Sequence, residues 1–229
     1  MTSTQLIRKL IPVSLKNRLR LEAQKVLNPP MMFPTYSAEV AHSFEDYRDD
    51  VRYATLALAI QRLEADRIGG AIAELGVHQG VTSRIMHRHA PHRRLYLFDT
   101  FEGFPSASLE VKQDDRFRDT SQERVAQFIG DHPQNVIFRA GYFPLTAAGL
   151  EDERFALVML DFDLYKSAID AFTFFYPRVV PGGFFFMHDY NNPESNHGIA
   201  RAAHEYLADK PEKLVEIPDV WGSAVFRKL

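Results

Sequence analysis

The sequence predicts an α/β fold in which a central, mostly parallel β-sheet is covered by helices on both faces. From residue 71 onward, short apolar runs alternate with helical stretches, and each run ends in a polar or glycine-bearing turn. Such alternation is typical of parallel sheets, because each crossover between neighbouring strands places a helix on one face. The last two runs flank a Pro-Asp turn and predict an antiparallel hairpin. We therefore expect one domain with seven strands.

The individual elements follow from local patterns. A long helix is expected over Ser43–Arg67, because apolar residues recur there at helical spacing before Gly69 and Gly70 stop it. Further helices are expected to begin near Val81 and Gly198. The expected strands are Ala71–Leu75, Leu95–Phe98, Val136–Phe138, Leu157–Leu160 and Gly183–Met187, followed by a hairpin of Leu214–Ile217 with Ser223–Arg227.

The first 34 residues are expected to form a basic helical extension outside the domain of residues 35–229. Residues 1–27 contain six lysines and arginines against Glu22 alone, and their apolar residues have helical spacing that Pro12 interrupts. Three alternatives stay open for this segment: a helix packed on the body or on a second subunit, a helix on a membrane surface, or a disordered tail. A homo-oligomer formed through this helix is one expected assembly.

Composition excludes several classes of protein. The chain of 229 residues contains no cysteine, which excludes disulfides and thiolate metal sites and leaves oxygen or imidazole as metal ligands. A net charge of -3 gives no electrostatic reason to expect nucleic-acid binding. No apolar run approaches the ~20 residues that cross a bilayer, and the N-terminus lacks the pattern of a secretory signal. We therefore expect a cytoplasmic protein without membrane insertion.

The turn after the first strand has the composition of a ligand-binding turn. Gly76 and Gly80 have no Cβ, so the backbone can approach a ligand closely. Their G-x-x-x-G spacing differs from the G-x-G-x-x-G of dinucleotide sites, which disfavours nicotinamide and flavin cofactors. Glu74 would repel a phosphate but suits a cationic ligand. The alternative is an ordinary tight turn.

The second strand ends in a carboxylate, Asp99. It follows Glu74 by 25 residues, at the position where an acidic side chain accepts both ribose hydroxyls of an adenosine. The alternative is that Asp99 only caps the segment that follows. Together, the glycine turn and Asp99 favour an adenosyl ligand without phosphates, a description that S-adenosylmethionine fits.

Four sequence blocks together resemble the macrocin O-methyltransferase family, which methylates sugar hydroxyls in antibiotic biosynthesis. The resemblance runs from about Thr35 to Leu207. It implies the class I methyltransferase (Rossmann-like) fold, with S-adenosylmethionine and a divalent metal, usually magnesium, as cofactors. The blocks are Glu74–Gly80, Phe98–Pro105, Leu160–Ser167, and Val180–Gly183 leading to His188-Asp189-Tyr190.

The resemblance also implies a set of residues that contact the cofactor. Glu74, Gly76 and Asp99 would contact it directly, and the segment near Thr35 could close over it. Its adenine side would be lined by Gly141, Tyr142 and Phe143. The remaining expected cofactor contacts are Gly80, Thr100, Phe101 and Asp161.

Carboxylates cluster at the ends of two later strands and predict a metal site. Asp161 and Asp163 follow one strand and Asp189 follows the next, so neighbouring strand ends bring them together. Such a group repels itself unless it is protonated or bridged by a cation. In the family pattern, metal lies on Asp161 and on two aspartates before Tyr190, the first of which is His188 here. An imidazole ligand would shift metal preference from magnesium toward manganese or another borderline metal.

Methyl transfer to a sugar hydroxyl requires help, because this hydroxyl is a weak acid and a poor nucleophile. Asp163 is the first candidate for the general base, since the second aspartate of this motif lies toward the acceptor in the family. For His188, three roles stay open: third metal ligand, general base, or packing alone.

We therefore expect an O-methyltransferase that acts on a sugar hydroxyl of a secondary metabolite or glycan. The alternatives are a metal-dependent catechol or phenol methyltransferase, and a cofactor-binding protein that lost catalysis with the aspartate-to-histidine change. The polar loop at residues 191–197 is either a substrate-facing lid or a solvated loop. Phe104, Phe143 and Tyr165 are candidates to stack on a sugar or aryl face.

Overall fold

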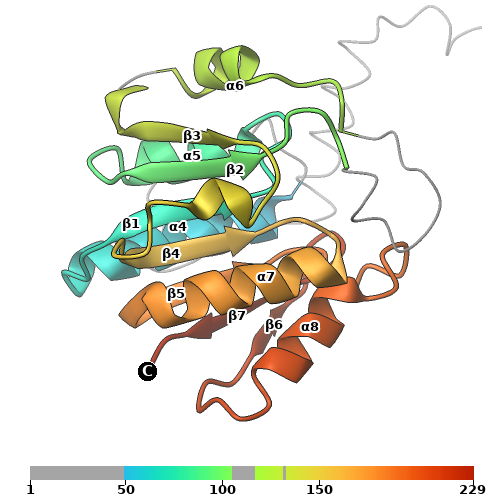
Figure 1. The fold of residues 1–229 in the computed structure, drawn as a ribbon. Coiled ribbons are helices and arrows are strands. Elements are labelled where there is room, and N and C mark those ends of the chain that lie inside the picture. Colours follow the sequence, from blue (N-terminus) through green and yellow to red (C-terminus); the bar gives the residue numbers. More distant parts are fainter. Residues whose placement is uncertain (1–48, 105–116, 131–132) are drawn as a thin grey trace, which may run out of the picture. The chain divides into compact units, whose positions relative to one another are not determined.

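A seven-stranded sheet forms the centre of the protein (Figure 1). The structure is a computed structural model that describes residues 49–104, 117–130 and 133–229. The strand order is β3-β2-β1-β4-β5-β7-β6, with β7 antiparallel to both β5 and β6 and the other pairs parallel. The strands are β1 (Ala71–Leu75), β2 (Leu95–Asp99), β3 (Val136–Ala140), β4 (Phe155–Leu160), β5 (Val179–Met187), β6 (Val215–Ile217) and β7 (Ser223–Arg227). The expected sheet and its closing hairpin are confirmed.

The strands β2, β3, β4 and β5 are longer than the sequence pattern predicts, and β5 differs most. β5 begins at Val179 rather than Gly183, because Val179 pairs with Phe155 of β4 and a register shift follows before Phe184 pairs with Leu157. The apolar pattern does not predict this earlier start, because Pro181 and the two glycines after it interrupt the run and both residue types are depleted in strands.

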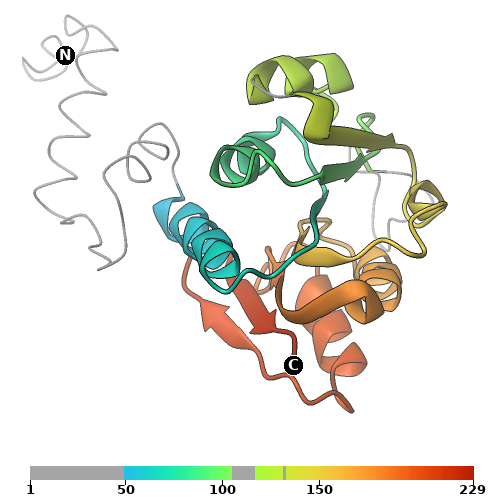
Figure 2. The ribbon, with the colours of Figure 1, turned by 90° about the vertical axis from the view of Figure 1, so that its left-hand side faces the viewer.

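Helices cover both faces of the sheet (Figure 2). One face carries α4 (Asp50–Ala65), α5 (Val81–His89) and α6 (Gln122–Ile129), and the other carries α7 (Tyr165–Phe175) and α8 (Gly198–Tyr206). Short 3₁₀ turns are η2 (Pro133–Asn135), η3 (Leu145–Ala147) and η4 (Tyr176–Arg178). Within the described residues, no helix has the length and apolar content that crossing a membrane requires.

Alternate residues of the strands point to the two helical layers. In β4, Leu157 and Met159 belong to the core under α4, α5 and α6, whereas Val158 and Leu160 belong to the core under α7 and α8. All six residues of β4 are buried. Burial on both faces explains why the parallel strands read as continuous apolar runs in the sequence.

The first described helix begins at a cap. The Asp49 carboxylate accepts a hydrogen bond from the Arg52 backbone N–H (3.4 Å), which satisfies a donor that the helix itself cannot pair. The helix ends at Ala65, and Arg67 adopts a left-handed conformation (φ 56°). Residues 43–48, the basic extension, the expected boundary at residues 34–35 and Thr35 lie outside the described residues.

Candidate active site

A cavity of about 390 Å³ lies where β1, β2, β4 and β5 end. The strand order reverses between β1 and β4, which is where ligands bind in open α/β sheets. Most of the expected site residues line this cavity: Glu74, Gly76, Asp99, Thr100, Gly141, Tyr142, Phe143, Asp161, Asp163, His188 and Asp189. Gly80 and Phe101 are not among its lining residues.

Gly76 has a specific steric role. It adopts φ 88°, and a Cβ at this position would collide with the backbone carbonyl oxygen of Asp161. Its N–H donates to the Phe98 carbonyl (2.9 Å), which keeps the turn in line with β2. The turn after β1 can therefore pass beside Asp161 only because residue 76 is glycine.

Gly80 and Phe101 serve packing in this structure. Gly80 is the N-cap of α5 with φ 81°, and a Cβ there would lie 2.8 Å from Val125 of α6. Phe101 packs against Phe138 of β3, with ring centroids 5.9 Å apart. Sequence spacing could not separate a glycine that approaches a ligand from one that approaches a neighbouring helix.

Asp99 organises the backbone of the cofactor turn. Its Oδ2 accepts hydrogen bonds from the N–H groups of Val77 (2.7 Å) and His78 (2.9 Å), and its Oδ1 accepts from Phe101 N–H (2.8 Å). A carboxylate has about four acceptor positions, so one remains for a ligand hydroxyl. Asp99 therefore caps the backbone of this turn, as one sequence interpretation expected. It also lines the cavity, where the other interpretation places a ribose hydroxyl.

Glu74 lines the cavity and is buried. Its side chain is 1% exposed and accepts a hydrogen bond from the Ser83 hydroxyl of α5. Burial raises the pKa of Glu74 well above its usual value, and nearby Asp161 adds to the rise, although the Ser83 bond opposes it. The Glu74 carboxyl is therefore a weaker acid than a solvent-exposed glutamate.

Asp161, His188 and Asp189 form a compact cluster beside this turn. Strand pairing sets their positions: Leu160 pairs with Met187, so the next residue of each strand, Asp161 or His188, comes adjacent. His188 Nδ1 lies 2.9 Å from Asp161 Oδ1 and 3.0 Å from Asp189 Oδ2. His188 Nε2 lies 2.9 Å from the carbonyl of Val220. Because a carbonyl only accepts hydrogen bonds, Nε2 carries a proton and Nδ1 faces the two carboxylates.

The cluster is strongly coupled electrostatically. Burial alone would lower the pKa of His188, but the charge of Asp161 and hydrogen bonds to both aspartates raise it to about 10. Burial alone would raise the pKa of Asp161, but His188 and then Arg52 lower it to about 2. Without a metal, the raised pKa favours the protonated imidazole of His188, whose positive charge offsets part of the negative charge of the two aspartates.

Arg52 belongs to this site although the sequence interpretation did not include it. It comes from the first turn of α4, lines the cavity, and places its guanidinium 3.4 Å from Asp161 Oδ2 and 3.3 Å from Asp49 Oδ2. It also donates to the Tyr53 hydroxyl (2.8 Å). Nothing in the local sequence could have indicated this role, since α4 is far from the strand ends in the chain.

Asp163 lines the cavity and is linked to Asp161, His188 and Asp189 through Asn192. The Asn192 amide donates to Asp189 Oδ1 (3.1 Å) and to Asp163 Oδ1 (3.4 Å), and both side chains of this second pair are buried. Asp163 has φ 64° and Asp189 has φ 53°, left-handed conformations that tight packing must hold. At least one residue of the polar loop after β5 therefore faces the site.

The donor set fits a divalent metal. Asp161, His188 and Asp189 each offer one ligand atom, and these atoms lie within 4.8 Å of one another. Carboxylate oxygens together with an imidazole nitrogen form a ligand set that divalent metals accept. The Nε2 hydrogen bond to Val220 holds the tautomer in which Nδ1 can be a ligand.

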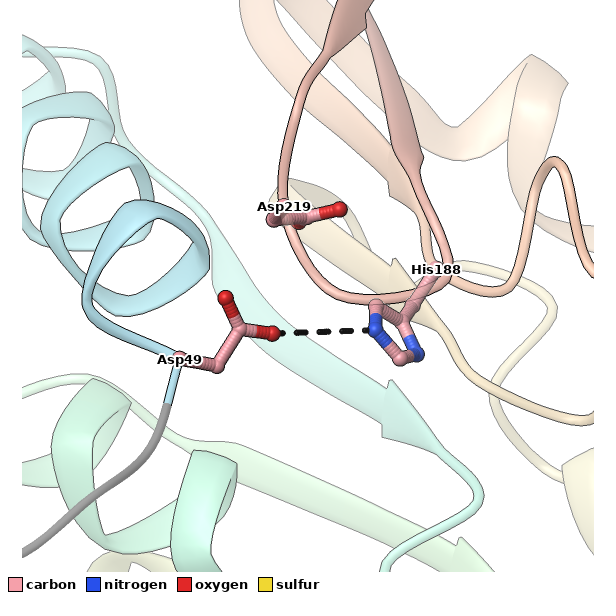
Figure 3. A group of neighbouring side chains, drawn as sticks. All are labelled: Asp49, His188 and Asp219. Carbon is pink, nitrogen blue, oxygen red and sulfur yellow. Dashed lines mark ion pairs between the residues drawn. The ribbon is translucent and has the colours of Figure 1, made fainter.

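A second group that could hold a metal shares His188 with the first (Figure 3). It contains Asp49 at the start of α4 and Asp219 of the β6–β7 turn, and Asp49 Oδ2 lies 3.9 Å from His188 Nε2. This second group fits a metal less well, because Nε2 already donates its proton to Val220.

Comparisons with known proteins agree with this geometry. The family described as macrocin-O-methyltransferase matches residues 40–228. The chain is 31% identical over 168 residues to 8-demethyl-8-(2,3-dimethoxy-alpha-L-rhamnosyl)-tetracenomycin-C 4'-O-methyltransferase of Streptomyces olivaceus, which covers 66% of this chain and 63% of that protein. The match thus spans slightly less than two thirds of the length of that relative.

A second relative and one solved structure extend the comparison. Mycinamicin III 3''-O-methyltransferase of Micromonospora griseorubida is 27% identical over 175 residues, which cover 68% of this chain and 67% of that protein. The solved structure of the O-methyltransferase NovP superposes with a TM-score of 0.66 at 22% identity, covering 94% of this chain and 98% of that chain. At this identity the structural likeness supports the class I methyltransferase fold alone.

Proposed function

We propose, given that the chain belongs to the macrocin O-methyltransferase family, that it transfers the methyl group of S-adenosylmethionine to a hydroxyl of a sugar unit on a secondary metabolite or glycan. The observation that carries this proposal is that the Asp99 turn and the Asp161, His188 and Asp189 cluster line one cavity. An adenosyl cofactor and a hydroxyl acceptor can therefore meet there.

The reaction is a displacement in which the sulfonium S–CH₃ bond breaks as the O–CH₃ bond forms. S-adenosylhomocysteine leaves, and the hydroxyl proton must be accepted by the protein or by solvent. The cofactor is already activated, so the protein contributes position and proton removal. Asp99 is proposed to hold the ribose, and Gly141, Tyr142 and Phe143 to form the adenine side of the cavity, which they line.

We assign the role of general base to Asp163. It lines the cavity, lies outside the group of Asp161, His188 and Asp189, and accepts a hydrogen bond from the Asn192 amide. Replacement by asparagine should lower turnover by roughly 10²- to 10⁴-fold and leave cofactor affinity within about twofold. Methyl transfer and calorimetric titration on the same preparation measure the two effects. Unchanged turnover would remove Asp163 from the mechanism.

Asp161, His188 and Asp189 are proposed to hold a divalent metal, with His188 bound through Nδ1. When bound, such a cation lowers the pKa of a coordinated hydroxyl and orients it. An imidazole and two carboxylates favour manganese or another borderline metal over magnesium. In this proposal Asn192 fixes the orientation of Asp189, and Arg52 holds the outer oxygen of Asp161.

The swap His188→Asp tests the ligand role. If His188 is a ligand, the variant should gain activity with Mg²⁺ relative to Mn²⁺, since three carboxylates are harder ligands. Turnover measured with each metal after removal of bound ions gives the ranking. An unaltered ranking would contradict the ligand role.

The whole proposal is tested by titrating S-adenosylmethionine into the protein with and without chelator, followed by mass spectrometry of glycosides incubated with the cofactor. We expect cofactor binding that chelation hardly changes, and a gain of one methyl group that chelation prevents. No binding at millimolar cofactor would refute the proposal. Methylation of catechols in preference to glycosides would favour the aryl alternative.

Assembly and location remain predictions. We propose a cytoplasmic enzyme that forms a homo-oligomer, through the basic extension or through the domain itself. Sedimentation of the full chain measures its mass in solution, and a monomer at micromolar concentration would refute the oligomer.

A further inference from the structure

The segment at residues 117–121, which leads into α6, is joined to the turn after β1 by side-chain contacts. Asp119 Oδ1 lies 2.8 Å from His78 Nε2, and Asp119 Oδ2 accepts a hydrogen bond from the Gln79 side-chain amide (2.8 Å). A carboxylate only accepts hydrogen bonds, so His78 Nε2 is the donor. The Thr120 hydroxyl donates to the His78 carbonyl. The proposed methyl transfer by itself assigns no role to these contacts.

The same segment supplies part of the cavity wall. Phe117 lines the cavity together with Phe104, His78 and Asp99. The ring of Phe117 meets the His78 ring edge to face, with centroids 5.0 Å apart, and meets the Phe104 ring in the same way at 5.2 Å. These three rings form a continuous set of contacts on the cofactor side of the cavity. The position of Phe117 therefore affects the shape of the space that the cofactor would occupy.

The backbone at Phe117 is held in an unfavourable conformation. Its φ of 64° lies in the left-handed region, which bulky side chains rarely adopt. His78, which the Phe117 ring contacts, also has a left-handed backbone, with φ 47°. Such conformations persist only where neighbouring contacts hold them. Asp119 makes contacts of this kind, because it binds the His78 side chain from a position two residues after Phe117.

The other end of the segment is anchored on α6. Ser121 caps this helix by accepting a hydrogen bond from the Arg124 backbone N–H (3.3 Å), and the Arg124 guanidinium donates to the Asp119 carbonyl (2.8 Å). The helix itself lies close to the start of α5, because a Cβ at Gly80 would be 2.8 Å from Val125. The helix therefore fixes one side of the segment, and the Asp119 carboxylate joins the other side to the turn after β1.

The exposure of these side chains indicates that they order the segment locally. The His78 side chain is 39% exposed and the Asp119 side chain is 65% exposed. Exposed polar pairs contribute little to the free energy of unfolding, because water competes for the same groups and two side chains must be ordered. Removal of the Asp119 carboxylate should therefore loosen residues 117–121 and leave the domain folded.

We propose that Asp119 is a positioning residue for the cofactor: by binding the side chains of His78 and Gln79, it holds Phe117 in the cavity wall and slows the release of S-adenosylmethionine and S-adenosylhomocysteine. Asp119 is not among the residues that line the cavity, so it acts through His78 and Phe117, which are. The inference rests on the proposed use of S-adenosylmethionine as methyl donor.

Removal of the carboxylate in the full chain provides a direct test. Asp119→Ala should weaken the binding of S-adenosylhomocysteine by roughly three- to tenfold, mainly through faster dissociation. Hydrogen exchange followed by mass spectrometry should show faster exchange at residues 117–121. The control Asp209→Ala removes a similarly exposed carboxylate that pairs with Lys210 (2.7 Å) away from the cavity, and it should change neither quantity. Unchanged affinity in Asp119→Ala, or an equal loss in both variants, overturns the inference.

A double-mutant cycle distinguishes the contact from a general structural effect. His78→Asn suits the positive φ, and combined with Asp119→Ala it should cost less affinity than the sum of the two single losses, because each single variant already breaks the same contact. Asp119→Asn keeps an acceptor oxygen for His78 and should restore most of the affinity. Additive losses overturn the inference. Titration of S-adenosylmethionine into the wild-type chain reports separately on the proposed function, which fails if the cofactor does not bind.

Discussion

Buried carboxylates are stabilised differently in the two halves of the cavity, the cofactor side after β1 and β2 and the side after β4 and β5. On the cofactor side, the Asp99 carboxylate is held by three backbone N–H groups, and Glu74 is buried with Ser83. On the side of β4 and β5, Asp161 is neutralised by the cationic side chains of His188 and Arg52. Backbone donors are fixed by the fold, whereas side-chain cations respond to pH and compete with a metal. The first half should therefore be rigid and the second adjustable.

Within this comparison of the two halves, the larger loss of turnover is expected on the adjustable side. Asp189→Asn removes one charge of the cluster, so turnover should fall by roughly 10²- to 10³-fold while S-adenosylmethionine affinity stays within about twofold. The control Asp170→Asn alters a half-buried carboxylate that pairs with Lys166 on α7, away from the cavity, and it should change neither quantity. Equal losses of turnover and cofactor affinity in Asp189→Asn would contradict the division into two halves.

The rigid side should respond mainly in stability. Gly76→Ala combines a positive φ with a collision against Asp161, so the free energy of unfolding should fall by about 2–4 kcal/mol. Gly149→Ala is the matched control, because φ is 82° there but a Cβ meets nothing within 4 Å. It should cost only about 1 kcal/mol. Urea unfolding measures both variants, and equal costs would show that the collision is relieved.

A smaller effect, on cofactor affinity, is expected for Asp99→Asn, which keeps the shape of the side chain but removes its charge. Asp99→Asn retains one oxygen for the N–H groups of Val77 and His78 but replaces the acceptor of Phe101 N–H and a ribose acceptor with a donor. Affinity for S-adenosylmethionine should fall by about tenfold, as expected for the loss of a charged hydrogen bond. Isothermal titration measures it. Wild-type affinity would show that Asp99 serves the turn alone.

The last prediction concerns the pH dependence of the metal-free protein. The His188 pKa is raised from 6.5 to about 10, so its contribution to stability is complete below about pH 6.5 and is lost as the pH rises through about 10. The Asp161 pKa is lowered from 3.8 to about 2, so its contribution is present above about pH 3.8 and is lost as the pH falls through about 2. Urea unfolding in chelator should show the alkaline loss in wild type and not in His188→Gln. A pH-independent difference between the two proteins would contradict this linkage.

The sequence predicted correctly those features that depend on local apolar patterns and on where neighbouring strands end. The apolar runs identified the strands because each parallel strand is buried on both faces, and Asp161 and His188 were brought together because parallel strands end at one edge. Gly80 shows the limit of this reasoning, since its neighbour is Val125 of another helix. Only packing could reveal this contact.

The sequence by itself therefore determined the sheet, its closing hairpin, the family and most residues of the candidate site, because these depend on residue periodicity and on the ends of strands. Only the tertiary structure decided that Arg52 approaches Asp161, that the Val220 carbonyl fixes the His188 tautomer, and that Trp221 borders the cavity. Each of these contacts joins segments distant in the chain. Their distances depend on how helices and turns pack over the sheet, and no local pattern encodes that packing.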